Sequence, residues 1–133
     1  MNKGLRTTDV LGQHLLAEFH DCSAELLNDC KFVENTMRDS ADIAGATIVT
    51  SSFHPFSPHG ISGIVVVKES HFAIHTWPEY NYAAVDIFSC NDKMKYTKAY
   101  EFLISRFQSK KHTFTVVPRG MLTEMQVNKW VTN

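Results

Sequence analysis

The sequence of 133 residues predicts an α+β fold: a two-layer sandwich in which an antiparallel sheet carries two helices on one face. Three observations predict it. About six β-branched or alternating segments run along the chain, two segments have helical periodicity, and the links between the central strands are of hairpin length. Residues 1–133 contain no repeat, low-complexity segment or linker, so we expect a single domain.

The first strand and the first helix are predicted by their apolar spacing. Residues 12–22 alternate, with Leu15, Ala17 and Phe19 on one face, which indicates a strand with one buried side. Apolar residues then recur at intervals of three and four up to Ala44, which indicates a helix. Asn28 and Asp29 would cap the start of this helix, and Gly45 would follow its end, because these residue types suit those positions.

The remaining elements are predicted in the same way. β-branched runs indicate strands over residues 46–53, 61–68, 71–77 and 82–90, with a proline- and glycine-containing loop over 54–60. A second amphipathic helix is expected from Tyr96 to Phe107. A last strand over 112–118 would end at Pro118, and the tail from Arg119 has only a weak helical pattern.

Composition excludes several classes of protein. The formal net charge is -1, so no basic field attracts nucleic acid or an anionic membrane. No apolar run is long enough to span a bilayer, and the first residues do not resemble a signal peptide. Three cysteines without metal-type spacing (Cys22, Cys30 and Cys90) fit a reducing compartment. The sequence therefore predicts a cytoplasmic protein.

The segment I-S-G-I-V-V-V, residues 61–67, is largely apolar on both of its alternating faces. Two helices are too few to cover both faces of the sheet. We therefore expect the second face to meet another subunit, most economically in a two-fold homodimer.

A run of polar residues follows this buried strand directly. Glu69, Ser70 and His71 come first, and His75 and Glu79 follow closely. Polar groups at the end of a buried strand cost free energy unless they are hydrogen-bonded or used in chemistry.

These residues also have simpler interpretations. Ser70 alone fits an ordinary surface serine, and Cys90 alone fits a packed small side chain. A hydrolase triad could be drawn from Ser70, His75 and Asp86, but the nucleophile elbow G-x-S-x-G is missing. A metal site lacks a third ligand with a recognised spacing, so we expect no metal at the four histidines His54, His59, His71 and His75.

The combination E-S-H-F-A-I-H-T-W-P-E, with Cys90 twenty residues after Ser70, resembles the core of the bacterial and archaeal S-adenosylmethionine decarboxylases. The resemblance extends from G-Q-H-L-L-A-E-F near the start to V-V-P-R-G near the end. Asn81 stands where glycine is common, and the residues after Gly120 overrun the usual end. Neither departure falls on a chemical position.

The resemblance implies a pyruvoyl cofactor made from Ser70 by self-cleavage. The Ser70 hydroxyl would attack the Glu69 carbonyl to give an ester. Loss of the Ser70 Cα proton would then expel the Glu69 carboxylate, and hydrolysis would leave a pyruvoyl group and ammonia. The chain would become two pieces, 1–69 and 70–133. The pyruvoyl carbonyl would form a Schiff base with the substrate amine and accept electrons during loss of carbon dioxide.

The resemblance also implies roles for other residues. His75 would remove the Cα proton during processing, Ser62 would assist that step, and Cys90 would reprotonate the substrate carbon. Phe56 would stack on adenine and Glu79 would accept hydrogen bonds from the ribose hydroxyls. The implied product is the aminopropyl donor for spermidine synthesis. The implied assembly is a homodimer of processed protomers, with two copies of each piece.

Two alternatives remain open. One is a relative on the same scaffold that decarboxylates arginine or ornithine, and the other is a regulatory subunit without activity. In addition, Ser70 and His75 are five positions apart in the sequence, which is an odd number. A regular strand would place these two side chains on opposite faces and about 16 Å apart, so either the strand bends or His75 serves another pyruvoyl group.

Overall fold

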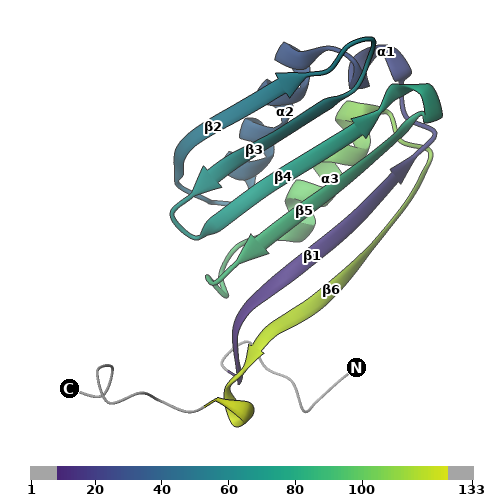
Figure 1. Ribbon diagram of the computed structural model, residues 1–133. Helices are drawn as coiled ribbons and strands as arrows, with labels where there is room; N and C mark the ends of the chain where they lie inside the picture. The colour runs from purple at the N-terminus through teal and green to yellow at the C-terminus, as the bar shows by residue number, and fades with distance from the viewer. Residues whose placement is uncertain (1–8, 126–133) are drawn as a thin grey trace.

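The computed structural model describes residues 9–125 and forms the predicted sandwich (Figure 1). Its strands are β1 (Val10–His20), β2 (Ile48–Pro55), β3 (Ile61–Val67), β4 (Ser70–Trp77), β5 (Tyr82–Ser89) and β6 (Lys111–Met121). Its helices are α1 (Ala24–Leu27), α2 (Cys30–Ile43) and α3 (Tyr96–Phe107), with short 3-10 turns η2 (Pro78–Tyr80) and η3 (Leu122–Glu124). The six strands form one antiparallel sheet in the order β2-β3-β4-β5-β1-β6.

The hydrophobic core lies between the sheet and the helices. The predicted inward face of β1 is buried, with Leu15 and Ala17 2% exposed and Phe19 fully buried. Val33 and Met37 of α2, and the corresponding apolar positions of α3, pack onto the same face. Figure 1 shows α2 and α3 together behind the sheet, which confirms the predicted arrangement of two principal helices on one face.

The boundaries of α2 follow the predicted caps. The Asp29 carboxylate accepts a hydrogen bond from the Phe32 N–H at 3.1 Å. Gly45, just beyond the helix, has φ +86°, which glycine adopts without a Cβ clash. The structure adds a third helix, α1, capped by the Ser23 hydroxyl, which accepts from the Leu26 N–H. One helical turn has no measurable periodicity, so the sequence pattern could not reveal it.

Two predicted strand ends are wrong. Pro118 does not stop the last strand, because β6 continues to Met121 and places Pro118 opposite Gln13. The strand β2 likewise runs into the predicted loop and ends at Pro55. Both strands lie at edges of the sheet, where a missing N–H can face away from the ladder. The weak helical pattern from Arg119 gives only η3 before residue 126, and the rest of it lies outside the described residues.

Within residues 9–125 no helix covers the second face of the sheet, here called the open face (Figure 1). It carries large apolar side chains beside polar ones. Leu16 and Ile64 are each 37% exposed and Trp77 is 40% exposed. Such a surface favours burial against a partner.

Candidate active site

The turn between β3 and β4 contains the Glu69–Ser70 peptide bond. Lys68 and Glu69 form the turn, and Ser70 is the first residue of β4, opposite Val67. The Glu69 carbonyl oxygen accepts two hydrogen bonds from Cys90, which lies just after β5. The Cys90 N–H donates at 3.1 Å and its thiol donates at 3.2 Å. Register between β4 and β5 causes this contact, since Ser70 pairs with Ser89.

The two Cys90 donors have a specific chemical consequence. Attack by the Ser70 hydroxyl on the Glu69 carbonyl carbon would place negative charge on the same oxygen. Preorganised donors aimed at an oxygen that gains charge stabilise the transition state of such an acyl transfer. This carbonyl therefore sits in an arrangement that can serve as an oxyanion hole.

The turn is also held from its other side. The Glu69 carboxylate accepts a hydrogen bond from the Thr47 N–H at 3.1 Å, and the Lys68 N–H donates to the Thr47 carbonyl at 2.9 Å. Thr47 lies in the link from α2 to β2. Contacts from two separate segments thus fix the backbone at the predicted cleavage point.

A second group of site residues lies at the opposite end of β4. His75 is the cross-strand partner of Ser62 on β3, and both side chains point to the open face. The Ser62 hydroxyl and His75 Nδ1 are 2.8 Å apart, a hydrogen bond whose direction depends on the imidazole tautomer. The pairing of two strands therefore creates the serine–histidine contact.

Ser62 and His75 line a cavity of about 320 Å³ together with both predicted substrate residues, Phe56 and Glu79. Phe56 comes from the loop before β3 and Glu79 from η2 after β4. Residues that are far apart in sequence thus meet at one end of the sheet. His59 and Trp77 also line this cavity, and sequence reasoning assigned neither of them to the substrate site.

Within one chain, the residues around Ser70 and those around His75 do not meet. The strand β4 is continuous from Ser70 to Trp77, with Phe72, Ile74 and Thr76 buried and His75 exposed on the other face. Ser70 therefore faces away from His75, and the two lie about 16 Å apart along the strand. The pairing of β4 with β3 and β5 has no register shift between these residues, which favours the alternative that His75 serves a group from another chain.

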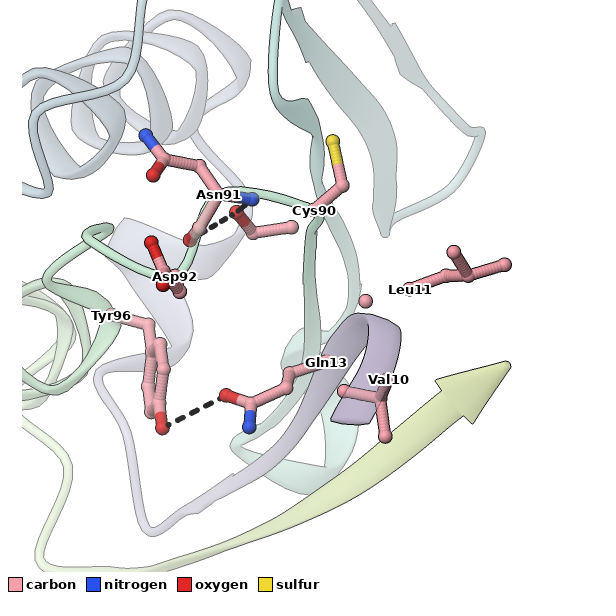
Figure 2. A pocket seen from close by; sticks show the side chains of 9 residues that line it. Val10, Leu11, Gln13, Cys90, Asn91, Asp92 and Tyr96 are labelled. Carbon is pink, nitrogen blue, oxygen red and sulfur yellow. Dashed lines mark hydrogen bonds between the residues drawn. The ribbon is translucent and has the colours of Figure 1, made fainter. Parts of the chain in front are cut away.

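A small cavity beside Cys90 was not foreseen from the sequence (Figure 2). It is lined by the first residues of β1 and by the segment after β5, and the Tyr96 hydroxyl donates to Gln13 Oε1 across it at 3.4 Å. Its volume is about 30 Å³. Since this is room for roughly one water, the cavity is too small for a nucleoside substrate.

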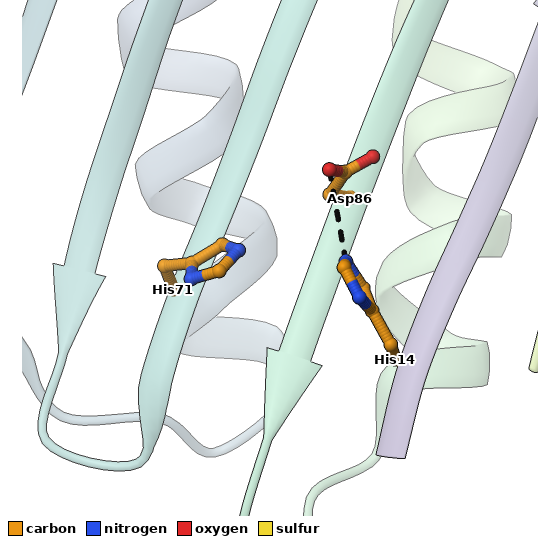
Figure 3. A group of neighbouring side chains, drawn as sticks. All are labelled: His14, His71 and Asp86. Atoms are coloured by element: carbon orange, nitrogen blue, oxygen red, sulfur yellow. Dashed lines mark ion pairs between the residues drawn. The ribbon is translucent and has the colours of Figure 1, made fainter. Parts of the chain in front are cut away.

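His14, His71 and Asp86 form a polar cluster on the open face, from β1, β4 and β5 (Figure 3). Their potential ligand atoms lie within 4.8 Å of one another, and His14 Nε2 is 3.6 Å from the Asp86 carboxylate. Sequence spacing did not reveal this trio because its members come from three strands.

A neighbouring positive charge opposes metal binding at this cluster. The Arg119 guanidinium, which can only donate, lies 3.1 Å from His14 Nδ1. This positive charge repels a metal cation at the adjacent cluster. Burial, followed by the charge of His14, lowers the pKa of His71, while Asp86 acts in the opposite direction. We therefore assign no metal to the trio.

Proteins of known structure and sequence are similar to this chain. A crystal structure of the adenosylmethionine decarboxylase from Aquifex aeolicus matches with a TM-score of 0.80 at 30% sequence identity, covering 90% of this chain and 99% of that chain. The molecule thus falls in the class of α+β sandwiches built like adenosylmethionine decarboxylases. In addition, residues 13–120 match the sequence profile of the S-adenosylmethionine decarboxylase family.

Two curated proteins strengthen this assignment. The S-adenosylmethionine decarboxylase proenzyme of Acetivibrio thermocellus is 48% identical over 116 residues, covering 87% of this chain and 94% of the relative. That of Thermosipho melanesiensis is 45% identical over 117 residues, covering 88% and 90%. The chain belongs to the S-adenosylmethionine decarboxylase family. Among its described residues, no helix is long and apolar enough to cross a membrane.

Proposed function

We propose that this protein is a proenzyme that cuts itself between Glu69 and Ser70 and then decarboxylates S-adenosylmethionine, giving the aminopropyl donor for spermidine synthesis. The observation that carries the proposal is the Glu69 carbonyl, which two Cys90 donors hold next to Ser70. Family membership supports both the reaction and the substrate.

The chain's own residues supply the processing chemistry. The Ser70 hydroxyl attacks the Glu69 carbonyl carbon, charge develops on the oxygen that Cys90 holds, and the C–N bond breaks to give an ester. His75, supported by Ser62, then removes the Ser70 Cα proton. The Glu69 carboxylate leaves, and water converts the dehydroalanine into a pyruvoyl group and ammonia.

A pyruvoyl group at position 70 supplies the electron-accepting carbonyl that decarboxylation of an amino acid requires. The residues around this position fit that group. Cys90 is exposed beside it and carries a thiol proton that can be delivered to the substrate carbon after carbon dioxide leaves.

The separation along β4 supports a site shared between two subunits. Ser70 and Cys90 of one protomer would meet Ser62 and His75 of its partner, because a two-fold axis that pairs the open faces can bring opposite ends of two sheets together. The exposed apolar residues of the open face give such a homodimer a physical basis. The processed assembly would contain two copies of each piece.

The cavity at the His75 end favours a nucleoside substrate. Phe56 is 51% exposed in the cavity and offers an aromatic face to adenine, and Glu79 offers carboxylate oxygens to a ribose diol. An arginine or ornithine decarboxylase would need neither residue. A regulatory subunit would be free to lose Ser70, His75 or Cys90, and all three are retained. We place the reaction in the cytoplasm, as the cysteine pattern suggests.

Intact mass spectrometry of the purified protein tests the proposal. We expect pieces 1–69 and 70–133, the second with a blocked, pyruvoyl N-terminus. Ser70→Ala should stay one chain and be inactive, whereas the control Ser57→Ala, in the exposed loop, should process normally. An intact wild-type chain that still decarboxylates S-adenosylmethionine would contradict the mechanism.

A further inference from the structure

We propose that His59 is a positioning residue for Glu79, holding its carboxylate ready for the vicinal hydroxyls of a nucleoside. The inference deepens the proposed function and rests on it, because it assumes that Glu79 receives the substrate's ribose. The sequence by itself assigned no role to His59.

The geometry joins two segments across the cavity. His59 Nε2 lies 3.2 Å from Glu79 Oε1, with His59 in the loop after β2 and Glu79 in η2 after β4. Both line the cavity that also contains Phe56. The imidazole engages one carboxylate oxygen and leaves Oε2 for the substrate. A carboxylate has enough lone pairs to accept from the imidazole and from two hydroxyls together.

The loop that carries His59 is fixed by its backbone. The Phe56 N–H donates to the Gly60 carbonyl at 2.8 Å and closes the loop on itself. The Gly60 N–H donates to Asn28 Oδ1 at 3.0 Å, which ties the loop to the start of α2. His59 is therefore presented from a defined position, and Phe56 is held in the same turn.

Glu79 is presented from an equally short and defined segment. Pro78, which is buried, begins η2, and the Asn81 N–H closes the turn by donating to the Pro78 carbonyl at 3.0 Å. The Glu79 side chain lines the cavity, and His59 is its ion-pair partner among the described residues. The imidazole is thus the group that restricts its rotamers.

The exposure of this pair argues for a role in binding over one in stability. The side chains of His59 and Glu79 are 39% and 36% exposed, and exposed ion pairs add little to the free energy of folding. Restricting a carboxylate before the ligand arrives lowers the entropy lost on binding. The neighbouring histidines are engaged elsewhere, since His75 contacts Ser62 and the His54 ring packs on Phe56 at 4.7 Å.

The test compares His59→Phe with His59→Gln in the full, self-processed enzyme, with cleavage checked by mass spectrometry. Phe keeps a ring but no donor, whereas Gln restores a donor to Glu79. We expect His59→Phe to raise KM for S-adenosylmethionine by about three- to tenfold with kcat nearly unchanged, and His59→Gln to stay close to wild type. His59→Asn, whose donor is shorter, replaces His59→Phe if the latter does not fold.

A double-mutant comparison separates the inference from the function on which it rests. In a Glu79→Gln background, His59→Phe should add no further rise in KM. If Glu79→Gln raises KM but His59→Phe does not, or if the two effects are additive, the positioning role is wrong and the proposed function stands. If Glu79→Gln itself leaves KM unchanged, the assignment of Glu79 to the nucleoside fails as well.

Discussion

The two ends of strand β4 are built differently, and we propose different tasks for them. At the Ser70 end, backbone groups dominate: the Glu69 carbonyl and the Lys68 N–H are held by neighbouring segments. At the His75 end, side chains from a loop, two strands and a 3-10 turn surround an open cavity. The difference teaches that cutting a chain needs an aligned peptide bond, whereas recognising a small molecule needs adaptable side chains. It also supports the proposal that each end belongs to a different subunit of one shared site.

The largest expected effect comes from mixing two variants that cannot process alone. Ser70→Ala lacks the nucleophile, and His75→Ala should stop at the ester. If the site is shared between subunits, a mixed dimer contains one complete site. That site combines Ser70 of the His75→Ala chain with His75 of the Ser70→Ala chain. We expect co-refolded mixtures to process about half of the His75→Ala chains and none of the Ser70→Ala chains, as random two-fold pairing requires.

Mass spectrometry reads this result directly, because the substitution marks which chain was cut. Differently tagged subunits confirm that mixed dimers form. Mixed dimers without any cleavage would show that each chain processes itself, and the comparison between the two ends of β4 would lose its basis.

Cys90→Ala should separate processing from turnover at the Ser70 end. Loss of the acid that reprotonates the substrate carbon should lower kcat by about 10²–10⁴-fold. Self-cleavage should slow by less, because the Cys90 N–H remains as a donor to the Glu69 carbonyl. Timed mass spectrometry and a carbon dioxide release assay measure the two rates, with Cys30→Ala as the control. Equal losses in both rates would refute separate roles for the thiol.

Glu79→Gln should affect only the nucleoside end. Replacing a charged acceptor by a neutral one should weaken S-adenosylmethionine binding by about 1.5–3 kcal/mol, the worth of a hydrogen bond to a charged group. Cleavage should proceed normally, because Glu79 has no assigned role in the acyl shift. KM and intact mass report the two properties, and the exposed Glu101→Gln on α3 is the matched control. Blocked cleavage would show that the two ends are not independent.

His71→Gln should produce the smallest effect, on the pH dependence of stability. Burial lowers the pKa of His71 from 6.5, so below about pH 6.5 the unfolded chain binds a proton that the folded chain resists. Stability should therefore fall as the pH falls, and His71→Gln should make that fall shallower. Melting temperatures of the unprocessed Ser70→Ala form, with and without His71→Gln, at pH 7.5 and 5.5 measure it. Identical slopes would exclude His71 as the cause.

Much of the fold could be predicted because apolar residues recur along the sequence with the period of the helix or strand that buries them. The alternation of β1 and the three- and four-residue spacing in α2 correspond directly to buried faces. The strand ends at Pro55 and Pro118 were misjudged, because the cost of proline depends on whether a strand lies at an edge. Which strands lie at the edges depends on the strand order of the whole sheet, and a local sequence pattern does not specify that order.

The candidate site was predictable as a set of residues but not as a geometry. The motif identified Ser70, His75 and Cys90, and the odd spacing indicated that the first two could not meet on a straight strand. The contact between Cys90 and the Glu69 carbonyl depends on the register of β4 and β5, and the one between His59 and Glu79 on two loops. Spacing along a chain does not specify either.

The strand order has a consequence for the folding and the denaturation of the protein. Residues before the proposed cut supply β1, β2 and β3, and those after it supply β4, β5 and β6, yet β1 lies between β5 and β6. The two pieces would therefore be interleaved in one sheet and should stay together after cleavage. Folding must come first, while one chain keeps both halves at high local concentration. Once cut, a molecule that unfolds must find its other half by diffusion, so the mature enzyme should denature irreversibly on dilution and heating, whereas the uncut Ser70→Ala chain should refold.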